Sequence, residues 1–358
     1  METREVYLPL HHGKAPYWLL SRMKKLARPI VWLIINEYGE KEIFKRLSDP
    51  IFFQSFSNIL GFDWNSSGST TVLIGVLKSV FNNSDEFDIK ISGGKGTEAL
   101  RTPDQIKKFS EKLGISDKKA EQYIKISRLV AKMDNSALQD GYDLYHHAFI
   151  FSRKYWTVIQ QGMNVNLKLA RRYHWNFSKD WKGIDWNTHS GIVAERKERS
   201  VINLLSEKSS ESRKLILDII KDRSFKKDYR KLISIIKVRD SSNVFLIPRK
   251  IDWRAVEKAY NLQPDNFEDF LLIKGIGKGT LRALALISDL IYNVNYDKED
   301  PAKYSFALGG KDGVPFPVHR ERYDEVIEFM QEVVKQTELG VFDKKQILAK
   351  LRSLLKRN

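Results

Sequence analysis

The chain has 358 residues, a hydrophobic content of 42% and a formal net charge of +16, and it contains no cysteine. The missing thiols exclude disulfides, thiolate catalysis, iron–sulfur clusters and zinc sites built on cysteine. The length is enough for two or three domains. The excess of positive charge favours a polyanionic partner such as a nucleic acid.

The N-terminal sequence lacks the basic and apolar pattern of a signal peptide. The apolar run at residues 29–35 is much shorter than a membrane span. A chain without cysteine is also compatible with a reducing compartment. We therefore expect a cytoplasmic protein with no membrane partner.

The first 130 residues are predicted to be mainly helical. Pro16 suits the first turn of a helix that is expected to kink or break at Pro29. The alternation of residues 87–92 predicts a half-buried strand that ends in the glycine-rich turn 93–96. Other helices are expected up to about residue 38, from residue 49, after a loop over 61–71 in a helix that carries Val76 and Val80, from Thr102 and over residues 117–130.

The second half of the chain changes character near Gly191. Before it, two aromatic-rich runs at 147–152 and 155–160 predict a β-hairpin. After it, helical periods are expected over 192–205, in two segments that end near Val238, and over 320–337 and 344–357. We therefore predict an α+β fold. Residues 1–190 would form a mixed domain with a small sheet, and residues 191–358 an all-helical domain.

A glycine-rich turn lies between two apolar helical segments in the stretch from Asn266 to Tyr292. The apolar residues after the turn recur at the spacing of an amphipathic helix. Glycine lets the backbone adopt positive φ and approach another surface closely. The amides that begin the second helix can point at an anion, and Lys278 and Arg282 place positive charge beside them.

This arrangement resembles the helix-hairpin-helix motif of DNA repair and recombination proteins, at about residues 265–293. The resemblance implies that the turn holds a DNA backbone phosphate without reading sequence. The implied contacts fall on Gly275, Gly277, Lys278, Gly279 and Thr280. The alternative is a plain pair of helices joined by a glycine turn.

The chain also resembles, along nearly its whole length, an uncharacterised prokaryotic family of unknown function. That family implies little about function beyond the helix-hairpin-helix. The stretches that carry the resemblance are residues 8–11, 13–16, 60–64, 66–68, 138–142, 144–147, 158–163, 170–174 and 309–318.

The densest polar passage, residues 132–147, suggests a possible active site beside the β-hairpin. Carboxylates suit Mg²⁺ or Mn²⁺, which polarise a phosphodiester and activate water. The sequence resembles restriction-type nucleases only loosely, because glutamines replace the expected acid and no lysine follows. The alternative is a polar network that orders a loop. The candidate metal ligands are Asp134, Asp140 and Asp143, and the candidate catalytic residues are Asp140, Lys132, His147 and Gln161.

A second candidate surface alternates cationic and aromatic residues over positions 170–175. Arg171, Arg172 and His174 are expected to contact the phosphates and bases of single-stranded nucleic acid, together with neighbouring rings. The alternative is an element whose aromatic side chains face the core while the arginines face solvent.

Taken together, these features predict a sequence-nonspecific DNA-binding and DNA-processing protein. The leading reaction class is metal-dependent endonuclease, and single-stranded or branched DNA is a possible partner. One alternative is a helix-hairpin-helix glycosylase, although Gly279 stands where the lyase-type enzymes carry their catalytic lysine. The other is a non-catalytic DNA-binding or scaffold protein.

Overall fold

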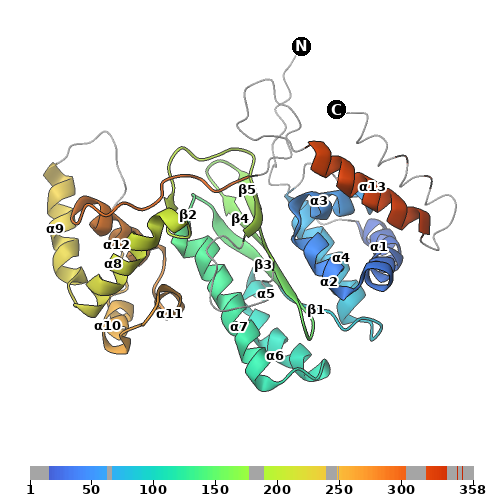
Figure 1. The fold of residues 1–358 in the computed structure, drawn as a ribbon, viewed down its shortest axis with the longest axis horizontal. Helices are drawn as coiled ribbons and strands as arrows, with labels where there is room; N and C mark the ends of the chain where they lie inside the picture. Colours follow the sequence, from blue (N-terminus) through green and yellow to red (C-terminus); the bar gives the residue numbers. More distant parts are fainter. Residues whose placement is uncertain are drawn as a thin grey trace, which may run out of the picture.

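A computed structural model describes residues 16–62, 67–176, 189–238, 248, 250–303, 320–336, 345 and 349. An antiparallel sheet lies between two helical layers (Figure 1). Its five described strands follow the order β1 (Lys90–Lys95), β3 (Asp143–Phe151), β4 (Trp156–Asn164), β5 (Leu169–Asn176) and β6 (His189–Val193). The fold is therefore α+β, as predicted.

The N-terminal helices cover one face of the sheet. They are α1 (Tyr17–Tyr38), α2 (Glu40–Ser48), α3 (Pro50–Ile59) and α4 (Gly68–Asn82), joined by α13 (Arg320–Gln336). The buried side chains of α13 belong to the same core as Ile150 and Ile159 of the sheet. Figure 1 shows α13 lying beside α1, so the two ends of the described chain are packed together.

The other helices share a second core with the opposite face of the sheet, which presents Phe149 and Tyr173. This core extends to the C-terminal helices, drawn at the left of Figure 1. The helices of this core are α6 (Thr102–Lys112), α7 (Asp117–Lys132), the π-helix η1 (Met133–Ala137), α8 (Ser210–Lys221), α9 (Phe225–Val238), α10 (Trp253–Leu262), α11 (Phe267–Leu272) and α12 (Lys278–Leu290). The short helices α5 (Thr97–Leu100) and η2 (Glu207–Ser209) add no residue to it.

The helix predicted over residues 192–205 is wrong. Residues 189–193 form the edge strand β6, and Ile202–Asn203 form strand β7, which pairs with β2 (Leu138–Gln139). The predicted boundary after residue 190 thus falls inside a strand of the sheet. A short apolar run fits either helix or strand, and here pairing with β5 decides the outcome.

Other predicted elements differ in detail. Helix α1 continues through Pro29 without ending, and strand β1 lies three residues later than expected. The β-hairpin is confirmed as β3 and β4, with Ala148 opposite Ile159. Asp49 caps α3 by accepting hydrogen bonds from two backbone amides. The last predicted helix, 344–357, lies outside the described residues apart from two positions.

Candidate nucleic-acid interface

Two helices flank the glycine-rich turn as the sequence indicates. Asn266 caps α11 through its side chain, which accepts a hydrogen bond from the Asp269 amide at 2.8 Å. Helix α12 begins at Lys278, directly after Gly277. We call residues 273–279 the glycine turn.

Two of the three glycines are required by close packing. Gly275 has a φ of +95°, and a Cβ there would lie 2.6 Å from Cβ of Ala255. A Cβ at Gly279 would lie 2.7 Å from the carbonyl oxygen of Lys250. Gly277 differs, since the nearest atom to its Cβ would be 4.0 Å away. The turn is thus pressed against residues 250–255 at two positions and open at the third.

The amides at the start of α12 are available for an external acceptor. The Ile276 amide donates to the Ile273 carbonyl at 3.1 Å, and the Leu281 amide donates to the Gly277 carbonyl at 3.1 Å. Between these two residues, the backbone amides of Gly277 to Thr280 donate to no acceptor in the described part of the chain. Gly275 is exposed and residues 277–279 are half-buried, whereas Thr280 is buried.

The carbonyl side of the turn is bound to the segment that follows α7. The Lys132 ammonium donates to the Ile276 carbonyl, and the Gln139 side chain donates to the Lys278 carbonyl at 3.0 Å. Burial lowers the pKa of Lys132. Lys132, expected as a catalytic helper, therefore fixes the turn in place.

The two predicted cations of the turn have protein partners. Lys278 donates to the Tyr142 carbonyl at 3.2 Å and forms an ion pair with Asp143. Arg282 donates to the Gln139 side chain at 2.9 Å. The Asp143 side chain is 76% exposed, and an ion pair so exposed is worth at most about 1 kcal/mol. A phosphate can therefore compete for Lys278.

Lys274 is a cation that the sequence reasoning missed. It is exposed, it directly precedes Gly275, and it has no ion-pair partner among the described residues. Its position beside the first glycine was the available signal. By contrast, no local signal linked the turn to Ala255, because that contact joins separate segments.

The three aspartates predicted as metal ligands do not converge. Asp134 accepts hydrogen bonds from Gln160 at 2.5 Å and Trp175 at 2.7 Å. Asp140 instead binds Arg171 at 2.8 Å, and Asp143 pairs with Lys278. Across the described ranges, no three histidine or acidic side chains are grouped so that they could hold a metal ion. These residues therefore do not fit the predicted Mg²⁺ or Mn²⁺ site.

His147 and Gln161, predicted to be catalytic, lie in separate buried networks. His147 shares hydrogen bonds with Ser127 at 2.8 Å and Gln160 at 2.7 Å, and burial lowers its pKa. Gln161 bonds instead to residues of the α4 side, including the Ser67 carbonyl at 2.9 Å. Neighbouring residues of a strand face opposite sides of the sheet, so Gln161 cannot join the network of Gln160.

Arg171, Arg172 and His174 are interior residues of β5 and do not form a nucleic-acid surface. Burial alone lowers an arginine pKa, but Asp140 and Asp300, both at 2.8 Å, raise the pKa of Arg171. On the opposite face, burial lowers the pKa of Arg172 to about 9. Burial likewise holds the pKa of His174 well below 6.5. The strand carries these cations inward because the sheet is covered on both faces.

Comparison with protein families supports the resemblance seen in the sequence. The model of a family described as "Protein of unknown function (DUF763)" matches residues 4–318. The chain belongs to this family. No curated protein and no solved structure matched it.

The DUF763 match covers both the sheet and the glycine turn, and it ends before α13. Among the described helices of this DUF763 member, none combines the length and apolar character needed to cross a lipid bilayer. The family description gives no activity, so any function has to be argued from the geometry of the residues.

Proposed function

We propose that the chain binds DNA through a helix-hairpin-helix formed by α11, the glycine turn and α12. The observation that carries this proposal is the row of unbonded amides at Gly277, Lys278 and Gly279. They begin a helix of 13 residues, whose dipole places partial positive charge at that end. A backbone phosphate supplies the acceptors that these amides lack.

The charges around the turn support an anionic ligand. Lys274 is exposed beside it, and Lys278 is held by an exposed ion pair with Asp143 and by a hydrogen bond to the Tyr142 carbonyl. The net charge of +16 favours encounter with a polyanion at longer range. Main-chain amides contact phosphates and do not read base edges, so the binding is expected to be independent of sequence.

The resemblance of the turn to those of DNA repair and recombination proteins supports a role in DNA processing. A metal-dependent endonuclease is not part of the proposal. Its expected ligands Asp134, Asp140 and Asp143 are committed to separate partners. The proposal therefore concerns binding, and the geometry favours no particular reaction.

The test is the affinity of the full chain for labelled duplexes of unrelated sequence, measured by fluorescence anisotropy. Gly277→Val places a side chain in front of the open amides, and no described atom lies within 4 Å of the new Cβ except one at that limit. Loss of two charge-assisted hydrogen bonds is expected to weaken binding about tenfold or more. Affinity should also fall log-linearly with salt.

The matched control for this experiment is Gly75→Ala, in the exposed middle of α4, where a Cβ also meets nothing within 4 Å. It should leave DNA affinity unchanged. Unfolding curves of both variants establish that each is folded. Wild-type affinity in a folded Gly277→Val protein would overturn the proposal.

A further inference from the structure

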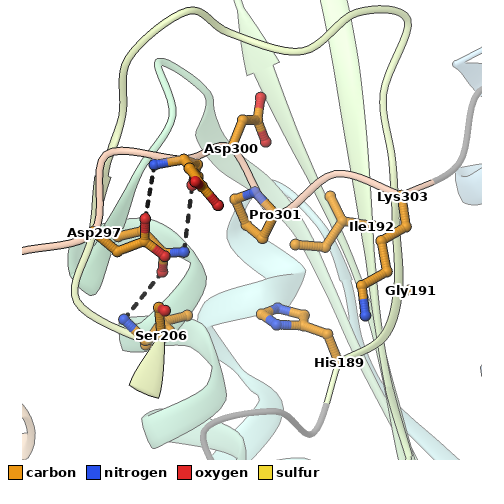
Figure 2. A pocket seen from close by; sticks show the side chains of 11 residues that line it. His189, Gly191, Ile192, Ser206, Asp297, Asp300, Pro301 and Lys303 are labelled. Carbon is orange, nitrogen blue, oxygen red and sulfur yellow. Dashed lines mark hydrogen bonds between the residues drawn. The ribbon is translucent and has the colours of Figure 1, made fainter. Parts of the chain in front are cut away.

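A pocket of about 170 Å³ lies between β6, β7 and the segment 297–303 (Figure 2). Hydrogen bonds fix its frame on two sides. The Lys303 amide donates to the Ile192 carbonyl at 3.1 Å, and the Asn203 amide donates to the Asp297 carbonyl at 3.0 Å. The segment is thus attached to both strands, and the space between them is a fixed feature of the fold.

One side of the pocket is the imidazole of His189, whose orientation is set by Asp134. The His189 Nε2 atom lies 2.6 Å from Oδ1 of Asp134, which is fully buried. Oδ2 of the same carboxylate accepts hydrogen bonds from Gln160 and Trp175. Asp134 therefore acts as an acceptor that holds the His189 ring through Nε2, and Nδ1 is the ring nitrogen that Asp134 does not bind.

A second acceptor is the carboxylate of Asp297. Its Oδ1 accepts a hydrogen bond from the Glu299 amide at 2.9 Å. In the described part of the chain, nothing donates to its Oδ2. Figure 2 shows Asp297 and His189 on different sides of the pocket, with Pro301 between them and Ile192 beyond. The pocket therefore combines a carboxylate acceptor and an imidazole with apolar surface.

The size of the pocket selects a small planar ligand. A cavity of about 150 Å³ in another protein holds benzene, so this one accommodates a single six-membered ring and its substituents. The free carboxylate oxygen of Asp297 requires an N–H donor on the edge of that ring. A pyrimidine base meets both conditions, since cytosine offers its exocyclic amino group to carboxylates and uracil or thymine offers the ring N–H.

The pocket is connected to the glycine turn through η1 and the β2–β7 ribbon. Lys132 binds the turn at the Ile276 carbonyl, and two residues later Asp134 orients His189. Leu138 pairs with Asn203 of the pocket, and the adjacent Gln139 binds the Lys278 carbonyl. The same segment therefore contacts both the glycine turn and the residues that line the pocket.

We propose that this pocket binds one unpaired pyrimidine base. Binding of a base that belongs to a DNA strand rests on the DNA binding proposed above. Binding of a free nucleoside does not depend on it. Proteins recognise unstacked bases by hydrogen bonds to their edges and by contact with their faces. Here Asp297 and His189 provide the hydrogen-bonding groups, and Pro301 and Ile192 provide the contact with the face of the base.

The test compares short labelled homopolymers of dC, dT and dA by fluorescence anisotropy. The wild-type chain should bind the two pyrimidine strands roughly tenfold more tightly than dA. Asp297→Asn keeps the size of the side chain and an oxygen for the Glu299 amide but replaces the free acceptor with a donor, so it should abolish this preference. Duplex affinity should not change in this variant.

The matched control is Glu299→Gln, which makes the same change of charge at the rim of the pocket. The Glu299 carboxylate is 76% exposed and pairs with Lys208 at 3.0 Å. This variant should keep the pyrimidine preference. The proposal would be overturned if the wild type bound dA as tightly as dC and dT. It would also be overturned if the two variants had the same pyrimidine preference.

Calorimetry with free cytidine, uridine and adenosine separates the two proposals. If the pyrimidine nucleosides bind and Asp297→Asn weakens that binding, the pocket proposal is supported. If no DNA binds in the same protein, only the function proposed for the turn fails. If DNA binds at the turn but neither nucleosides nor homopolymers show a pyrimidine preference, the pocket proposal fails alone.

Discussion

The ion pair of Asp140 and Arg171 and the amides of the glycine turn are both polar features of the fold, but they differ in whether their groups have partners. In the sheet, Asp140 and Arg171 are buried and bonded to each other. At the turn, the amides of Gly277 to Gly279 are bonded to no described acceptor. A buried polar group is costly unless it is paired. The paired groups of the sheet thus serve stability, and the unpaired amides of the turn remain for a ligand.

The largest expected effect is that of Arg171→Met on stability. The substitution leaves the buried carboxylates of Asp140 and Asp300 without their cation. Removal of one partner of a buried ion pair costs about 3–5 kcal/mol. Urea unfolding should show this loss, whereas Arg128→Met, at an exposed position of α7, should change little. Equal stability of the two variants would show that the sheet network is not structural.

Acid should destabilise the sheet through its buried histidines. Burial lowers the pKa of His146 to about 3 and also lowers those of His147 and His174. Below pH 6.5 the unfolded chain takes up protons that the folded chain does not, so stability falls from pH 6.5 towards about 3. The loss at pH 5.5 is roughly 1.4 kcal/mol for His146. A free energy of unfolding that stays constant between pH 7.5 and 5.5 would contradict this assignment.

The packing of the turn can be tested by adding one methyl group. Gly279→Ala would place Cβ 2.7 Å from the Lys250 carbonyl oxygen, and overpacking of this kind costs about 1–3 kcal/mol. Gly75→Ala has open space and should be neutral or stabilising by up to about 1 kcal/mol. Thermal unfolding compares the two variants. A Gly279→Ala protein as stable as Gly75→Ala would mean that the turn is not held against residue 250.

The smallest expected effect is that of Asp143→Asn, which releases Lys278 from its exposed partner. Stability should change by less than about 1 kcal/mol, while DNA affinity should rise about two- to fivefold because an anion is removed near the turn. Asp88→Asn is the matched control, since Asp88 is also exposed and forms an ion pair with Arg153. An equal rise in affinity for both variants would reflect net charge alone.

Local patterns in the sequence predicted the elements whose signals are local. Two apolar, aromatic-rich runs predicted the hairpin of β3 and β4, and the apolar segments on both sides of the glycine-rich turn predicted α11 and α12. The edge strand β6 was missed because its pairing with β5 is a tertiary feature. The glycine turn was visible in sequence as a pattern, but its attachment to Lys132 and Gln139 was not.

The sequence did not predict the burial or the partners of the polar residues in 132–174. Asp134, Asp140 and Arg171 have the residue types of an active site or a binding surface, and only the fold shows that they are buried and separately paired. Of the alternatives weighed for residues 132–147, the structure agrees with the hydrogen-bonded network. The alternative for residues 170–175, in which the arginines face solvent, is wrong, because Arg171 and Arg172 are buried. His189 drew no attention in the sequence, although it completes the pair with Asp134 beside the pocket.

The most direct test of DNA binding at the turn is to follow its backbone amides by NMR while a short duplex is added. The amides of Gly277, Lys278 and Gly279 should show the largest shifts and become protected from exchange. Those of Ile276 and Leu281 should change less, because they already donate to Ile273 and Gly277. Unchanged resonances for residues 277–279 in a sample that binds DNA would contradict the account.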